Sequence, residues 1–212
     1  IKNPLTPMKL SVQYLEKAWK DKVPDWDERL TRFSKTMIEQ IDNMSAIARE
    51  FSDFAQMPAA ENARINLRRL IPEVLDLYKG YEKLNIRLSF SGEQKEFFVN
   101  ADRKQMLRVF NNLIKNAIQS YDKDDTAEIG VMCSLKQNHC TITIRDNGCG
   151  IPKEEQDKIF NPYYTTKAKG MGLGLSIVKN TIEGIGGTIN FHSKEGAGST
   201  FILTIPLATP SE

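Results

Sequence analysis

The sequence predicts an α+β protein in which an antiparallel helical hairpin precedes a two-layer domain of one sheet and its covering helices. Two observations favour this fold class. Residues 1–57 carry apolar side chains spaced three and four residues apart, which is the helical period. Residues 67–206 combine helical periods with short segments in which apolar and polar residues alternate. We therefore expect two domains, residues 1–59 and residues 60–212.

Two helices are predicted within residues 1–57. The first has an apolar stripe at Leu5, Met8, Val12, Leu15 and Trp19. The second has a 3.5-residue period through Leu30, Met37, Ile41, Met44, Ala48, Phe51 and Ala55. Residues 21–27 include Pro24 and supply the turn. A hairpin this small cannot bury both stripes, so we expect a second copy to complete a four-helix bundle. Packing on the next domain of the same chain is the alternative.

The second domain is predicted to follow a linker at residues 58–66. Its helices are expected near residues 67–80, 102–121 and 173–184. Its strands are expected near residues 86–91, 96–100, 128–135, 140–145, 188–192 and 200–205. The alternation in Thr141-Ile142-Thr143-Ile144 indicates a sheet with one buried face.

The composition argues against several functional classes. The 212 residues are 40% hydrophobic, and 29 Lys and Arg nearly balance 27 Asp and Glu. Positive charge is not concentrated in any segment, so we expect no nucleic-acid partner. No apolar run approaches the roughly 20 residues of a membrane helix, so we expect no direct membrane contact. The three cysteines lack a disulfide or zinc spacing, which favours a reducing, cytoplasmic location.

Glycines gather in three clusters that point to a phosphate-binding site. The clusters are Asp146-Asn147-Gly148-Cys149-Gly150, Gly170-Met171-Gly172-Leu173-Gly174 and Gly196-Ala197-Gly198-Ser199-Thr200. Glycine-rich turns expose backbone N–H groups, and a helix N-terminus adds a favourable potential for anions. The second cluster opens a predicted helix and is therefore a candidate phosphate cradle. The third is equally consistent with an ordinary turn. The dinucleotide and Walker patterns are both absent.

Two asparagines on the helix predicted at 102–121 suggest a metal site. Asn112 and Asn116 are one turn apart, so both amides project from one face. Buried hydrogen bonds are the common role of a single asparagine in an apolar helix. A pair at this spacing, followed by Asp-x-Gly-x-Gly, favours ligands of a hydrated Mg²⁺ on a nucleotide, because Mg²⁺ prefers oxygen donors.

Together these motifs resemble the sensor histidine kinases of two-component signalling and, more widely, the GHKL ATPases, which include gyrase B and MutL. The matching boxes are Asn112–Ala117, Asp146–Pro152, Ile159–Lys167, Gly170–Ser176 and Gly196–Phe201. The resemblance implies a Bergerat-type ATP-binding sandwich, with ATP and Mg²⁺ as cofactors. It also implies a homodimer through residues 1–57 and a response regulator receiver domain as partner.

The start of the chain adds to this resemblance. Ile1-Lys2-Asn3-Pro4-Leu5 is similar to the tail of the H box, His-Glu-Ile-Lys-Asn-Pro-Leu, of sensors of the NtrY type. The acceptor histidine would then precede Ile1, so we expect these residues alone to bind ATP without phosphorylating themselves. Asn3 could orient water for dephosphorylating the regulator, or could simply precede Pro4.

The resemblance assigns roles to individual residues. Asp146 would accept a hydrogen bond from the adenine amine, Asn116 would bind Mg²⁺, and Asn112 would help to position the metal and the phosphates. Lys167 would contact the γ-phosphate. Lid flexibility is assigned to Gly170, Gly172 and Gly174. The pocket is completed by Gly148, Gly150, Ile151, Tyr163, Leu173 and Leu175, and by Thr200, which would support Asp146 through water.

Asn112 distinguishes two kinds of reaction. By resemblance, ATP-hydrolysing relatives carry Glu at this place as a general base, and Asn has no comparable basicity. We therefore expect transfer to a histidine and then to an aspartate of the regulator, with phosphatase activity as a further possibility. A non-catalytic ATP-binding dimerisation module is the alternative function.

Overall fold

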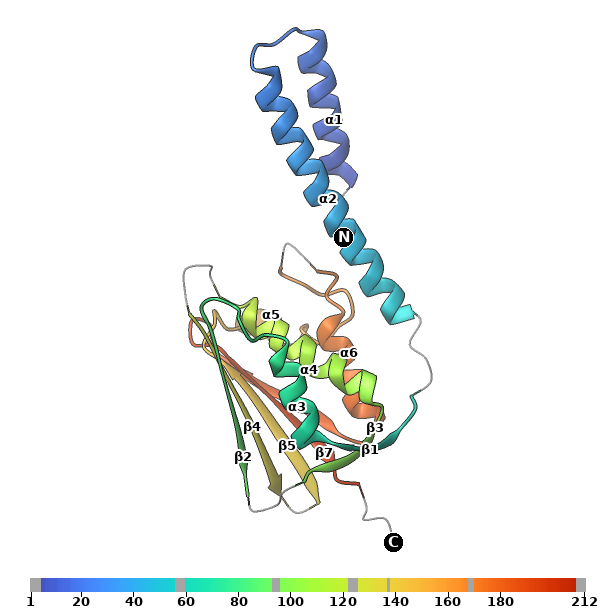
Figure 1. Ribbon diagram of the computed structural model, residues 1–212, viewed down its shortest axis with the longest axis vertical. Helices are drawn as coiled ribbons and strands as arrows, with labels where there is room; N and C mark the ends of the chain where they lie inside the picture. Colours follow the sequence, from blue (N-terminus) through green and yellow to red (C-terminus); the bar gives the residue numbers. More distant parts are fainter. Residues whose placement is uncertain are drawn as a thin grey trace. The chain divides into compact units, whose positions relative to one another are not determined.

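The computed structural model describes residues 5–55, 60–92, 96–121, 126–136, 138–167 and 170–208. The chain divides into two compact units, one formed by Ile1–Met57 with Thr166–Met171 and the other by Pro58–Thr165 with Gly172–Glu212. Within the described ranges, no helix is both long and apolar enough to cross a bilayer. Figure 1 shows the helices and strands of both units.

The first unit contains helices α1 (Leu5–Lys20) and α2 (Trp26–Ala55). The turn is shorter than predicted, because α2 begins at Trp26 rather than after residue 27. Asp27 and Glu28 lie in the first turn of α2, where negative charge is favoured by the helix dipole. The rings of Trp19 and Trp26 are in contact across the turn, with centroids 4.9 Å apart and their planes tilted by 57°. Pairing with a second copy stays a prediction.

The second unit is built on a five-stranded sheet with the order β2-β4-β5-β7-β6. Its strands are β2 (Leu84–Ser91), β4 (Ala127–Lys136), β5 (His139–Asp146), β6 (Thr188–Ser193) and β7 (Ser199–Pro206). Strands β2 and β4 are parallel, and the other neighbours are antiparallel. Helices α3 (Leu67–Asp76), α4 (Arg103–Ile118) and α6 (Gly174–Gly184) cover one face (Figure 1). The predicted two-layer α+β architecture is confirmed.

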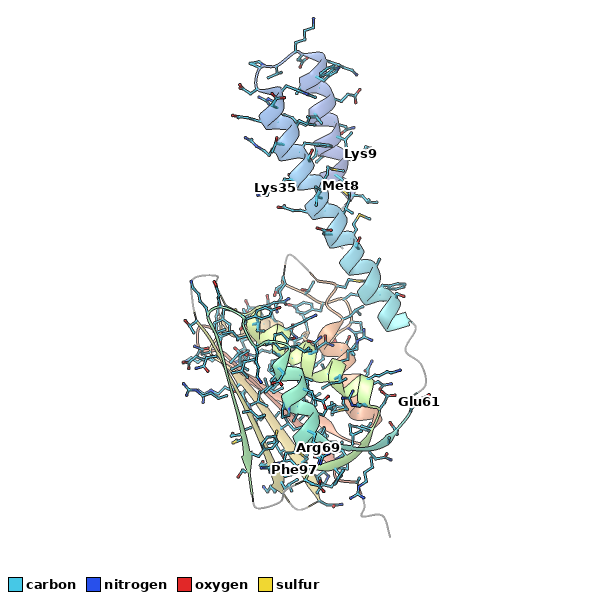
Figure 2. All side chains as sticks on the ribbon, in the orientation of Figure 1. Met8, Lys9, Lys35, Glu61, Arg69 and Phe97 are labelled. Carbon is cyan, nitrogen blue, oxygen red and sulfur yellow. The ribbon has the colours of Figure 1, made fainter. Side chains whose placement is uncertain are left out.

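The hydrophobic core lies between this helical layer and the sheet. Alternate residues of β5 are buried, including Ile142 and Ile144, while their neighbours face away from the helices. Helix α4 contributes Phe110 and Leu113, which are at most 2% exposed. Figure 2 shows the side chains that fill the space between the two layers. Burial on this scale is the main stabilising contribution to the unit.

Two short elements escaped the sequence analysis. The linker prediction is wrong for residues 63–66, which form β1 (Ala63–Asn66), and this strand pairs antiparallel with β3 (Phe98–Ala101) in a separate two-stranded sheet. Four residues are too few to show a period, and the partner lies more than thirty residues away. Helix α5 (Lys153–Gln156) is equally short. The predicted strand at 96–100 is shifted to Phe98–Ala101.

Candidate nucleotide-binding site

Hydrogen bonds connect the segments that the sequence singled out. The amide of Cys149, in the loop after β5, donates to the carbonyl of Ser120 just beyond α4 (2.9 Å). The carbonyl of Cys149 in turn accepts from the amide of Gly196 in the β6–β7 turn (2.7 Å). The amide side chain of Asn112 donates to the carbonyl of Gly174, the first residue of α6 (3.3 Å). Helix α4 is therefore hydrogen-bonded to the start of α6, and the residue just beyond its end is hydrogen-bonded to the loop after β5.

Asp146 is the last residue of β5 and is only 5% exposed. Its Oδ1 accepts hydrogen bonds from the amides of Gly148 (3.0 Å) and Ser199 (3.1 Å). The Ser120 hydroxyl, which also contacts the carbonyl of Ala117 (2.7 Å), lies 3.4 Å from the same oxygen. A buried carboxyl group needs such partners, and these contacts from three segments fix its orientation.

The loop after Asp146 passes so close to its neighbours that it has no room for side chains at two positions. A β-carbon at Gly148 would lie 1.9 Å from the Ser120 hydroxyl oxygen. A β-carbon at Gly150 would lie 2.1 Å from the carbonyl oxygen of Lys194, and Gly150 also has φ +70°. Both glycines are thus required for the loop to approach α4 and the β6–β7 turn.

Ile151 continues this loop and is held by side chains that the sequence analysis did not single out. Its amide donates to the Ser193 hydroxyl oxygen (2.8 Å), which lies 2.9 Å from the hydroxyl of Ser199. The Gln156 side chain donates to the carbonyls of Ile151 (3.0 Å) and Ser193 (3.2 Å). The β6–β7 turn thereby anchors the loop.

Asn112 and Asn116 lie on α4, with half-buried side chains one turn apart. Leu113 and Ile114, between them in the chain, are 1% exposed and belong to the core. The core therefore fixes the rotation of α4 about its axis. The asparagine oxygens are hard donors of the kind that Mg²⁺ prefers.

The predicted lid residues are distributed over both compact units. Lys167 and Gly170 belong to the segment Thr166–Met171, outside the unit that holds Asp146, and their roles stay predictions. Tyr163 is 53% exposed, with φ +66°. A β-carbon at Gly172 would lie 2.2 Å from the carbonyl oxygen of Tyr164, so the chain passes closely over itself there. Leu173 is 1% exposed.

The remaining predicted residues are placed less directly. Leu175 packs against the core in the first turn of α6. Thr200 is opposite Arg145 in the β5–β7 ladder, and the described contact to Asp146 comes from its neighbour Ser199. Asn3 lies outside the described residues. Nothing in the sequence indicated a role for Ser120, Tyr121, Ser193 or Ser199, because single polar residues at the ends of elements carry no periodic signal.

Comparison with protein families shows which family contains this arrangement of segments. Residues 101–209 match the family described as histidine kinase-, DNA gyrase B- and HSP90-like ATPase. The chain belongs to this family. The match spans α4, the loop after Asp146, α6 and the β6–β7 turn, which are the segments that form the candidate site.

Individual members of the family support the resemblance to sensor histidine kinases. The chain is 33% identical over 207 residues to the putative sensor histidine kinase NtrY-like of Rickettsia bellii, covering 98% of this chain and 34% of that protein. It is 32% identical to the sensor histidine kinase ZraS of Escherichia coli, covering 98% of this chain and 43% of that protein. The chain thus spans less than half the length of these relatives and corresponds to a sensor histidine kinase catalytic core.

Solved structures agree with this assignment. The nucleotide-free catalytic domain of histidine kinase ThkA has a TM-score of 0.61 and 32% identity, covering 69% of this chain and 95% of that one. The structure of ThkA in complex with the response regulator protein TrrA has a TM-score of 0.70 over 98% of this chain and 58% of that one. Its identity to this chain is 24%, so it supports the fold alone.

Proposed function

We propose that this chain is the cytoplasmic core of a two-component sensor histidine kinase, which binds Mg-ATP and transfers its γ-phosphoryl group to a histidine. The observation that carries the proposal is the buried carboxyl group of Asp146. It is held by the amides of Gly148 and Ser199, and the loop that follows it is hydrogen-bonded to Ser120, just beyond the helix that bears Asn112 and Asn116. Fixed polar groups of this kind are typical of small-molecule sites.

Asp146 selects the base in this proposal. An ionised carboxylate accepts hydrogen bonds and cannot donate them, and the 6-amino group of adenine is a donor. Guanine and hypoxanthine carry a carbonyl oxygen at position 6. This oxygen and the carboxylate are both acceptors, so no hydrogen bond would form between them. Because Asp146 is already buried and oriented in the free protein, base binding costs little side-chain entropy at this residue.

Asn112 and Asn116 serve the phosphate end. Within the described residues, no group of three His, Cys, Asp or Glu side chains is placed to hold a metal ion. Amide oxygens, phosphate oxygens and water form a ligand set that suits Mg²⁺, so the donors of α4 fit the proposed ion. Bound Mg²⁺ would offset phosphate charge during transfer. Lys167 would add positive charge at the γ-phosphate, and the Gly172–Gly174 backbone would close over the triphosphate.

The acceptor is a neutral imidazole nitrogen in the segment that precedes Ile1. Its lone pair attacks the γ-phosphorus, the bond to the β–γ bridging oxygen breaks, and ADP leaves. The absence of a carboxylate at Asn112 supports this transfer over hydrolysis, since an amide cannot deprotonate water. The phosphohistidine then passes its phosphoryl group to an aspartate of a response regulator.

The helical unit would form a homodimer and dock the regulator. Its helices expose large apolar side chains that a single hairpin leaves uncovered: Leu10, Val12, Trp19, Leu30, Ile38, Ile41 and Phe51. A second copy would bury them in a four-helix bundle. A response regulator is the further partner that the resemblance to sensor histidine kinases implies.

Nucleotide binding is the first test. Titration calorimetry with Mg-ATP compares the chain with its Asp146→Asn variant, and Asp157→Asn, an exposed carboxylate beside α5, is the matched control. A hydrogen bond to a charged group contributes about 1.5–3 kcal/mol, so Asp146→Asn should weaken binding about 10- to 150-fold. Equal affinities for all three proteins would refute the role of Asp146.

Phosphotransfer is the second test. The parent protein, including the residues that precede Ile1, is incubated with γ-labelled ATP and Mg²⁺, and label that survives base but not acid identifies phosphohistidine. We expect label in the wild type and none in Asn116→Asp. Tight nucleotide binding without label would favour the non-catalytic ATP-binding module instead.

A further inference from the structure

Tyr121 follows α4 and reaches the point where the β4–β5 ladder ends. Its hydroxyl oxygen accepts hydrogen bonds from the amides of Asn147 (2.7 Å) and Glu128 (3.2 Å). The hydroxyl is also within hydrogen-bond reach of the Glu128 carbonyl (2.8 Å) and of the Asn147 side-chain oxygen. Burial raises the pKa of Tyr121, so the hydroxyl keeps its proton and can donate at neutral pH.

The register of the strands shows what this hydroxyl replaces. The β4–β5 ladder ends with Ile129 opposite Asp146, so Glu128 and Asn147 would form the next pair. Both of their amides point instead to the Tyr121 hydroxyl, and the Glu128 amide also donates to the Asn147 side chain (3.0 Å). The Tyr121 hydroxyl thus takes the place of the backbone hydrogen bonds that the next pair of the ladder would form. The chain is thereby released from the sheet immediately after Asp146.

The residue before Tyr121 holds the other end of the same loop. The carbonyl of Ser120 accepts from the amide of Cys149 (2.9 Å), and the Ser120 hydroxyl lies 3.4 Å from Oδ1 of Asp146. Tyr121 fixes the backbone one residue after Asp146, and Ser120 fixes it three residues after. Residues 120 and 121 therefore fix the loop that carries the amide of Gly148, one of the donors to Asp146.

We propose that Tyr121 is a positioning residue for base recognition: its hydroxyl fixes the backbone at Asn147 and so orients the Asp146 carboxylate toward the 6-amino group of adenine. This inference rests on the proposed function of Asp146. It predicts that Tyr121 controls the discrimination between adenine and a purine that lacks this amino group. A merely structural tyrosine would affect both purines equally.

The test measures the dissociation constants of Mg-ATP and Mg-ITP, since inosine carries an oxygen in place of the amino group. Tyr121→Phe keeps the ring and removes the hydroxyl. We expect the preference for ATP over ITP to fall about two- to twelvefold, the size of one neutral hydrogen bond. Tyr78→Phe is the matched control, because Tyr78 bonds Asn111 on another part of α4. Its preference should stay at the wild-type value.

A double-mutant cycle separates action through Asp146 from a general loss of stability. In the Asp146→Asn background, Tyr121→Phe should reduce the ATP preference no further, since the group that it positions is already changed. If Tyr121→Phe weakens both nucleotides equally, or lowers only the melting temperature, the inference is overturned. If this variant does not fold, Asn147→Ala replaces it. It removes the side-chain oxygen to which the same hydroxyl donates, and this acceptor keeps the hydroxyl lone pairs turned toward the backbone amide of Asn147, so the preference should fall in the same direction. An unchanged preference in that variant would also overturn the inference.

Failure of the proposed function has a different signature. If the wild-type chain binds neither nucleotide, or binds ATP and ITP with equal affinity, both adenine recognition by Asp146 and the role of Tyr121 are refuted. If the wild-type chain prefers ATP and Tyr121→Phe has the same preference, only the role of Tyr121 is refuted.

Discussion

Replacement of Gly150 by alanine should destabilise the sheet unit because of two separable costs. Gly150 has φ +70°, a conformation that costs an alanine about 1–2 kcal/mol. Its β-carbon would also lie 2.1 Å from the carbonyl oxygen of Lys194, and relief of such an overlap costs about 1–3 kcal/mol. The two contributions predict a loss of about 2–5 kcal/mol in the free energy of unfolding.

Two other glycines provide controls that isolate each cost. Gly80 has φ +94° but open space around its β-carbon position, so Gly80→Ala should cost only the conformational part, about 1–2 kcal/mol. Gly130, on β4, has neither a positive φ nor a close neighbour, so Gly130→Ala should be neutral or stabilise by up to about 1 kcal/mol.

Urea unfolding followed by far-ultraviolet circular dichroism gives all three values on one scale. The order of destabilisation should be Gly150→Ala, then Gly80→Ala, then Gly130→Ala. If Gly150→Ala costs no more than Gly80→Ala, the close approach of the loop to the β6–β7 turn adds no cost, and this turn does not hold the loop rigidly.

Two further predictions concern a thiol and a helix cap. Cys149 is exposed, whereas Cys133 and Cys140 are buried and burial raises the pKa of both thiols to about 12, so iodoacetamide should alkylate Cys149 alone in the folded protein. Mg-ATP should slow this reaction, and mass spectrometry that finds label on the buried thiols, or no protection by nucleotide, would contradict the prediction. Asp102 caps α4 by accepting from the amide of Gln105 (3.0 Å), and this bond is the main cause of its lowered pKa. Asp102→Ala should therefore cost about 1–2 kcal/mol at neutral pH. The pKa of Asp102 is lower in the folded than in the unfolded state, so the stabilisation by this cap is complete above about pH 3.9 and is lost as the pH falls through the folded pKa. The free energies of unfolding of wild type and variant should therefore converge in acid.

The fold was largely predictable because its main elements carry local periods. The alternation of β5 and the apolar face of α4 are visible in any short window of the sequence, and the structure has both close to the expected positions. Strand β1 was not predictable in this way, since its four residues depend on a partner strand that is distant in the chain. The start of α2 was missed because Pro24 suggested a longer turn.

The candidate site was predictable to the extent that it uses unusual residue types. Clustered glycines and paired asparagines stand out in a sequence, and so does Asp146 before Gly148. The residues that hold Asp146 in place do not stand out. Tyr121 contacts Asn147, 26 residues away, and Ser199 contacts Asp146 across 53 residues. Such contacts follow from the packing of α4 on the sheet and from the pairing of β7 with β5, which only the folded structure reveals.

The contact between Trp19 and Trp26 has a practical consequence. The protein has two tryptophans, and both lie at the turn of the helical unit. Indole fluorescence therefore reports on the hairpin and gives no direct signal from the second unit, which makes it an intrinsic optical probe of one of the two units. A change in emission upon addition of nucleotide would mean that ligation of the sheet unit is communicated to the hairpin, without any attached dye.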